Sequence, residues 1–175
     1  TPRSVRTNVL SHCPASHIQA MPFRGAGHRT WLIQNNVFGE TACCNSIVLS
    51  QSAPGGDCSS FVVRYNVMSG PVNGVYCDGG RLQLYANVFT QNVSSCARNS
   101  DEAYNIYPAR NRATCAGSGN RKCNPATVAP EATPTNYRLL PTDRCARGAG
   151  DPRRFPGTDM AGLHRPQGLL PDAGP

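Results

Sequence analysis

The sequence predicts an all-β solenoid of stacked parallel strands, and three observations support this. Glycine and proline make up 17 and 15 of the 175 residues, which leaves little room for long helices. A short motif built on asparagine recurs along the first half of the chain. A second series of short apolar segments follows nearly the same period.

The recurring motif is an asparagine followed by valine and one further apolar residue. Three copies each end a longer apolar segment, and a fourth copy lies upstream of them. They recur every ~20–30 residues, which is a solenoid period. The copies are Asn8-Val9-Leu10, Asn36-Val37-Phe38, Asn66-Val67-Met68 and Asn87-Val88-Phe89.

The second series of apolar segments lies between the copies of the motif. Two interleaved strand series with one period predict two strands in each turn of the solenoid, with a short third strand. The segments of this series centre on Ile18, Ile47, Val75 and Ile106.

Alternation along each strand assigns its faces, because successive side chains point to opposite sides. We expect each asparagine of the motif at a bend, in the left-handed conformation, with its amide bonded to the same residue of the next turn. The expected inward positions are Trp31, Ile33, Phe61, Val63, Leu82 and Leu84, followed after the bend by Phe38, Met68 and Phe89.

Two parts of the chain carry a family resemblance. The strings Ile-Gln-Asn-Asn-Val-Phe (33–38) and Tyr-Ala-Asn-Val-Phe (85–89) resemble the right-handed parallel β-helix repeat of polysaccharide lyases, pectinases, tailspikes and many surface proteins. The segments 159–166 and 170–174 are similar to an ending of many bacterial β-helix proteins, Asp-x-x-Gly-x-x-Arg-Pro followed by Asp-x-Gly. The resemblance implies a right-handed parallel β-helix of about four coils. An antiparallel sandwich is the alternative fold, because regularly spaced short strands also suit that class.

The coils are expected to occupy residues 1–110, and a loop-rich C-terminal extension and cap to occupy 111–175. Several prolines interrupt the extension, although residues 137–140 read as one further strand. We expect the extension to pack on the coils as a cap or side layer, since an uncovered last coil exposes an unpaired strand edge. No cap is evident at the other end, so further N-terminal coils of the same protein are expected upstream.

Nine cysteines are too many for an ordinary reduced cytosolic protein, and they lack the paired spacing near histidines that a zinc site shows. They therefore indicate an oxidising compartment, and hence a secreted or cell-surface protein. Cys115 and Cys123 bracket a small loop and are predicted to form a disulfide. Cys58 and Cys77 would lie on neighbouring turns near one corner and form a second candidate pair. Because nine is odd, at least one thiol is unpaired or is bonded outside this chain.

Asp57 and Asp78 precede their next asparagine by the same number of residues, so they are expected to stack on adjacent turns. Two adjacent carboxylates are a candidate calcium site, or an acid and base pair. In the alternative interpretation each aspartate caps its own glycine-containing turn, and Arg81 neutralises Asp78.

Gln34, Arg64 and Tyr85 each lie two residues before an asparagine of the motif and are expected to form an outward column on the sheet. A tyrosine ring suits a pyranose face, and a guanidinium pairs with a uronate carboxylate. The column is therefore the candidate substrate-binding site, and ordinary solvated surface is the alternative.

Two functions remain open. The first is an extracellular β-helix that binds or processes an anionic polysaccharide or cell-surface glycan, and as an enzyme it would be a polysaccharide lyase or glycoside hydrolase. The histidine and paired-carboxylate settings that the pectinase resemblance requires are absent, so catalysis stays undecided. The second is a non-catalytic structural or adhesive cell-surface module.

Nucleic-acid binding is a distant third function, and we expect neither a nucleic-acid partner nor a membrane span. The net charge of +7 comes from arginine, since Lys122 is the only lysine, and the basic residues are dispersed without an aromatic stacking platform. No apolar run approaches the ~18 residues of a membrane span.

Overall fold

The chain forms an all-β structure in a computed structural model, and the described residues contain strands and no helix. The description covers residues 3–6, 9–10, 18–20, 30–38, 47–49, 60–68, 72–73, 81–93, 100–112, 115–129, 136–166 and 168–174.

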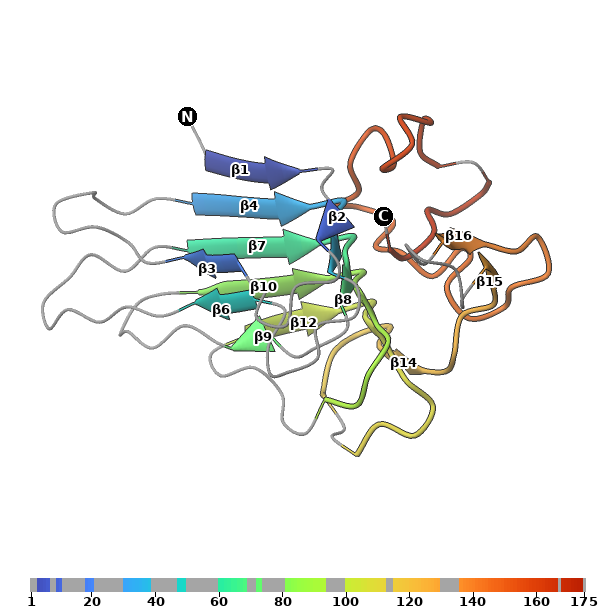
Figure 1. Ribbon diagram of the computed structural model, residues 1–175, viewed down its shortest axis with the longest axis horizontal. Coiled ribbons are helices and arrows are strands. Elements are labelled where there is room, and N and C mark those ends of the chain that lie inside the picture. Colours follow the sequence, from blue (N-terminus) through green and yellow to red (C-terminus); the bar gives the residue numbers. More distant parts are fainter. Residues whose placement is uncertain are drawn as a thin grey trace, which may run out of the picture.

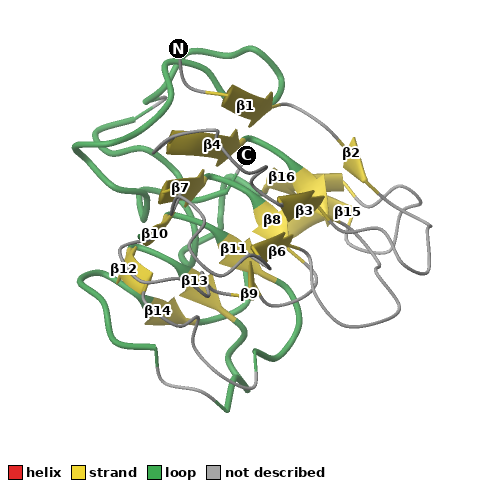
Figure 2. Cartoon of the chain, turned by 90° about the vertical axis from the view of Figure 1, so that its left-hand side faces the viewer, coloured by secondary structure: helices red, strands yellow, loops and turns green. Residues whose placement is uncertain are grey.

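Three sheets are built only from parallel pairs (Figures 1 and 2). The first sheet contains, in spatial order, β1 (Arg3–Arg6), β4 (Thr30–Gln34), β7 (Ser60–Arg64), β10 (Leu82–Tyr85) and β12 (Ser100–Ala103). The second contains β2 (Val9–Leu10), β5 (Val37–Phe38), β8 (Val67–Met68), β11 (Val88–Phe89), β13 (Ile106–Tyr107) and β14 (Arg121–Lys122). The third contains β3 (Ile18–Ala20), β6 (Ile47–Leu49) and β9 (Val72–Asn73).

In the first three passages the chain runs from the first sheet to the second and third and then returns to the first, where the new strand pairs with the strand of the previous passage. Among the described residues, the later passages add no strand to the third sheet. The copies of the asparagine motif align in register, Val9 with Val37, Val37 with Val67 and Val67 with Val88. The predicted parallel stacking is thus confirmed, and the antiparallel sandwich is wrong.

The interior of the stack is apolar, as the alternation predicts. The buried side chains of the first sheet are Ile33, Phe61, Val63, Leu82 and Leu84, and those of the second sheet are Phe38, Met68 and Phe89. Trp31 packs against this cluster. Phe89 also stacks on Tyr107, with 4.8 Å between ring centroids. This interior cluster holds the first and second sheets together across the bend.

The bend between those two sheets carries a ladder of buried asparagines. Asn66 shows the pattern: its backbone N donates to Asn87 Oδ1 at 3.1 Å, and its Nδ2 donates to the same oxygen at 3.0 Å and to Ile33 O at 3.0 Å. The side chain therefore joins consecutive passages. Equivalent bonds run from Asn36 to Asn66, from Asn87 to Asn105 and, through the backbone N alone, from Asn105 to Asn120.

The predicted left-handed conformation belongs to the residue before each ladder asparagine, not to the asparagine itself. Asn35, Tyr65, Ala86 and Tyr104 have φ between 52° and 57°, and Gly119 has a φ of 74°. Turning the chain one residue earlier leaves the asparagine free to enter the next strand with its side chain turned inward. The ladder was predicted correctly, and the position of the bend was wrong by one residue.

The second apolar series is only partly correct. Ile18 and Ile47 pair in the third sheet as predicted, but the next partner is Val72 and not Val75. Ile106 pairs with Val88 and belongs to the second sheet. The cause is that the passages shorten along the chain: the ladder asparagines are separated by 30, 21, 18 and 15 residues. A constant period therefore assigned the last segment to the wrong sheet.

The second sheet also continues beyond residue 110, where regular coils were expected to end. Arg121 and Lys122 in β14 pair with Ile106 and Tyr107. Beyond β14, β15 (Thr127–Ala129) and β16 (Asn136–Leu139) form an antiparallel pair, which includes most of the strand predicted at 137–140.

The C-terminal residues then return along the side of the stack, where Figure 1 shows them in orange and red beside the ends of the first-sheet strands. Ala146, Ala149 and Ala173 pack with Val67 and Val88 on the outer side of the second sheet. This agrees with the expectation that the extension forms a side layer.

The predicted Cys115–Cys123 disulfide is wrong, because Cys123 is bonded to Cys145 with a Cα–Cα distance of 5.8 Å. Cys115 lies in the interior cluster, whereas Cys123 packs against the outer cluster beside the C-terminal residues. Their side chains therefore face different clusters. Cys115 also forms a disulfide. The predicted Cys58–Cys77 pair lies outside the described residues.

Replacing Asn66 with alanine should lower the free energy of unfolding by about 3 kcal/mol, because it leaves buried donors and an acceptor without partners on both neighbouring passages. Chemical denaturation monitored by circular dichroism measures this. The matched control is Asn92→Ala, at an exposed position, for which a change within about 0.5 kcal/mol is expected. Equal effects of the two substitutions would contradict a structural role for the ladder.

Candidate functional site

The structure places Gln34, Arg64 and Tyr85 side by side at the ends of β4, β7 and β10. Gln34 is in register with Arg64, and Arg64 with Tyr85. Arg6 of β1 precedes Gln34 in the same column. The column predicted from the spacing therefore exists and is one residue longer than predicted.

Arg64 is held in the column by its neighbour. Its Nε and Nη2 both donate to Gln34 Oε1, at 3.0 and 2.9 Å, and its Nη1 donates to Arg154 O at 3.4 Å. These bonds engage three of the five N–H groups of a guanidinium. One N–H on each terminal nitrogen remains, and these groups can donate to a carboxylate.

Tyr85 does not offer the open ring face that the sequence predicted. It is 3 % exposed, and the guanidinium of Arg154 lies 4.7 Å from its ring centroid. Its hydroxyl donates to Asp101 Oδ2 at 2.6 Å, and burial, followed by this bond, raises the pKa of Tyr85. The guanidinium of Arg154 therefore lies where a sugar ring was expected to stack.

A groove with a volume of about 340 Å³ lies between the rest of the column and the C-terminal residues. One wall comes from Arg6, Gln34 and Arg64. The opposite wall comes from the C-terminal residues Phe155, Pro156, Gly157, Thr158 and His164.

The lining of the groove is basic. It contains two arginines and a histidine, and no carboxylate is among its described residues. The pKa of Arg64 is lowered, mainly by burial and also by the neighbouring charge of Arg6. Tyr65 and Asp151 act in the opposite direction. Arginine nevertheless stays protonated at physiological pH, so the groove presents a partly desolvated positive charge. Such a site favours an anion.

The C-terminal wall is anchored on the bend that carries the left-handed residues. Tyr65 OH donates to Asp151 O at 3.0 Å, and Asn35 Nδ2 donates to Thr158 O at 2.9 Å. The guanidinium of Arg165 lies 4.6 Å from the Tyr65 ring centroid, and its Nη2 donates to Gly174 O at 2.8 Å. The wall is thus fixed to the same passages that carry the column.

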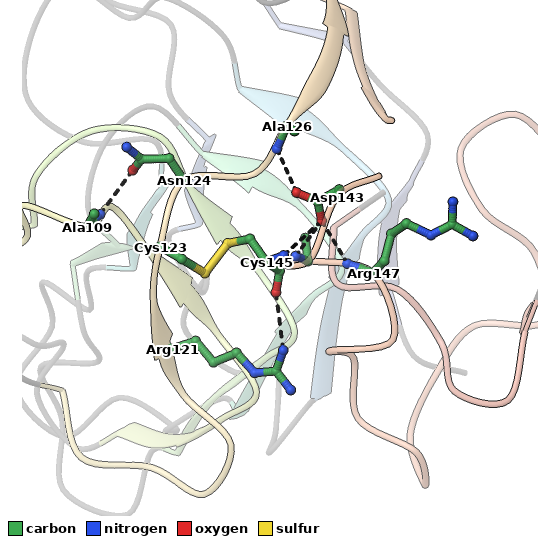
Figure 3. The surroundings of a disulfide bond; sticks show 9 residues. Ala109, Arg121, Cys123, Asn124, Ala126, Asp143, Cys145 and Arg147 are labelled. Atoms are coloured by element: carbon green, nitrogen blue, oxygen red, sulfur yellow. Dashed lines mark hydrogen bonds between the residues drawn. A yellow bond between two sulfur atoms is a disulfide. The ribbon is translucent and has the colours of Figure 1, made fainter. Parts of the chain in front are cut away.

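The base of the C-terminal wall is held by Asp143 and the disulfide (Figure 3). Asp143 Oδ1 accepts from Ala126 N at 2.6 Å, and Oδ2 accepts from the backbone N of Cys145, Ala146 and Arg147 at 3.2, 2.7 and 3.0 Å. The Cys123–Cys145 bond links this turn to the end of β14. One carboxylate and one disulfide therefore fix the start of the returning segment.

The predicted calcium site is not tested, because Asp57 and Asp78 both lie outside the described residues. Within the described ranges, no three His, Cys, Asp or Glu side chains gather in a metal-binding arrangement.

Arg6 and all residues of the C-terminal wall escaped the prediction from sequence. Arg6 lies two residues before Asn8, at the same offset as the other members of the column, so its position was available in the sequence. Phe155 and His164 carry no such signal, because they reach the groove only through the return of the C-terminal residues.

No family model matches this chain, and comparisons with curated proteins and with solved structures likewise found no match. Across the described part of the chain, no helix is long and apolar enough to cross a membrane.

Replacing Asp143 with alanine should cost about 3 kcal/mol of unfolding free energy, since four backbone N–H groups lose their acceptor. Thermal and chemical denaturation measure the loss. Asp159→Ala is the comparison, because its carboxylate accepts from Leu163 N in an exposed turn, and about 1 kcal/mol is expected there. An Asp143 variant no less stable than the Asp159 variant would contradict this role.

Proposed function

We propose that the chain is a right-handed parallel β-helix. The repeated passage through three parallel sheets supports this, as do the asparagine ladder and the apolar interior. The right hand follows from the strong preference of parallel crossover connections in one sheet. Nine cysteines and the Cys123–Cys145 bond support a secreted or cell-surface location.

We further propose that the protein binds an anionic polysaccharide or cell-surface glycan through the groove between the column and the C-terminal wall. The observation that carries this proposal is the basic lining: Arg6, Arg64 and His164 converge on one groove whose described lining contains no carboxylate. The remaining N–H groups of Arg64 can donate to a uronate carboxylate. Phe155 provides an apolar ring beside them, which suits one face of a sugar.

The proposal is for binding. Glycoside hydrolases of the common type act with two carboxylic acids across the scissile bond, and nothing in the described lining supports that chemistry. A lyase or hydrolase activity therefore rests only on the β-helix resemblance.

A structural or adhesive module without a ligand groove is the second candidate. The low exposure of the column favours this function. Gln34 is only 6 % exposed and accepts hydrogen bonds from Arg64, and Tyr85 is only 3 % exposed and lies under the guanidinium of Arg154. In this function the disulfide-linked C-terminal layer stiffens the stack.

Calorimetric titration with polygalacturonate tests the binding function. Wild-type protein should bind, and Arg64→Gln should bind about 10- to 100-fold more weakly, because a charge-assisted pair is lost. Arg64→Lys keeps the charge but not the planar fork and should fall between them.

The matched control is Arg153→Gln, which removes the same charge from an exposed position that does not line the groove. Loss of binding in this control to the same extent as in Arg64→Gln would indicate a diffuse charge effect and contradict the groove. No binding by wild-type protein to polygalacturonate, alginate or hyaluronate would leave the structural module as the function.

A further inference from the structure

The groove does not follow the whole column of first-sheet residues. It includes Arg6, Gln34 and Arg64, on three neighbouring strands, and stops before Tyr85. Adjacent strands lie ~4.8 Å apart, so these three positions span about 10 Å. The groove therefore ends on the β10 side of the column.

The end of the groove near β10 is closed by Arg154. Its guanidinium covers the Tyr85 ring at 4.7 Å, and its carbonyl oxygen accepts from Arg64 Nη1 at 3.4 Å. Tyr85 is in turn fixed by its bond to Asp101. A polymer lying along the column would have to displace this contact to pass from Arg64 to Tyr85.

The wall behind Arg154 is not a loose flap. Pro156 is buried, and Phe155 packs against the outer cluster that also contains Val67 and Val88. Asn35 holds the next residues through Thr158 O. The closed end is therefore part of the packed structure.

The volume of the groove agrees with a small occupant. About 340 Å³ is near the lower limit of the ~300–1,000 Å³ typical of pockets for small molecules. A site that holds one carboxylate at Arg64, has a ring at Phe155 and is closed beyond Arg64 fits one acidic sugar.

We propose that the groove binds the terminal acidic residue of a polysaccharide chain, and not a segment within the chain. Arg64 takes the carboxylate, Phe155 lies against the sugar ring, and Arg154 stops the chain from continuing toward β10. This inference rests on the proposed binding function and adds which part of the polymer is recognised.

Binding of galacturonic acid, trigalacturonic acid and long polygalacturonate, measured by calorimetry, tests the inference. The monomer and the trimer should bind with dissociation constants within about threefold of each other, because both fill one residue's site. For two polymer samples of equal mass but different chain length, the amount of protein bound at saturation should be proportional to the number of chain ends in each sample. Glucose should bind at least tenfold more weakly than galacturonic acid, since it lacks the charged group.

An affinity that rises tenfold or more from monomer to trimer would overturn recognition of the chain end while leaving the binding function intact. Failure of every acidic sugar and polymer to bind would instead overturn the binding function. The two failures are therefore distinguishable.

The Arg154→Ala variant tests the closed end directly. Removing the guanidinium uncovers Tyr85 and should make the trimer bind several-fold more tightly than the monomer, whereas Arg153→Ala should leave the two alike. A trimer that binds no better than the monomer to Arg154→Ala would contradict the role of Arg154.

The Phe155→Leu variant keeps an apolar side chain against the outer cluster and removes the ring, so monomer affinity should fall several-fold. Unchanged affinity for the monomer would contradict the role of Phe155.

Discussion

The asparagine ladder connects consecutive passages of this structure at the bend between the first and second sheets. The side chains of Asn66 and Asn87 accept from the previous passage and donate to backbone carbonyls, so their polar atoms are paired although both residues are buried. The same geometry requires a left-handed residue immediately before it. Because the bend and the ladder recur together, the strands on either side keep their register while the connections between them change in length.

The candidate site depends on that bend. The left-handed residues Asn35 and Tyr65 turn their side chains outward, where they bond to Thr158 and Asp151 and hold the C-terminal wall. The neighbouring strand positions supply Gln34 and Arg64 for the opposite wall. The left-handed bend that the ladder requires thus determines where the groove lies on the outside of the stack.

The sequence predicted those parts of the fold that depend on local alternation. Inward residues such as Phe61 and Leu82, the parallel register and the ladder follow from a period of two and a repeated motif. The assignment of Ile106 was wrong because the passages shorten, and nothing in one segment reveals the length of the next connection. The column was predictable for the same local reason. The cover over Tyr85 and the pairing of Cys123 with Cys145 depend on distant residues returning to the stack, which no local pattern encodes.

Hydrogen exchange of asparagine side-chain amides, followed by nuclear magnetic resonance in deuterated water, tests the ladder most directly. Buried, bonded Nδ2 hydrogens exchange only when the structure opens. The account predicts that the side-chain amide signals of Asn36, Asn66 and Asn87 persist long after that of exposed Asn92 has disappeared. Exchange of all four within the same short time would contradict a ladder that joins the passages.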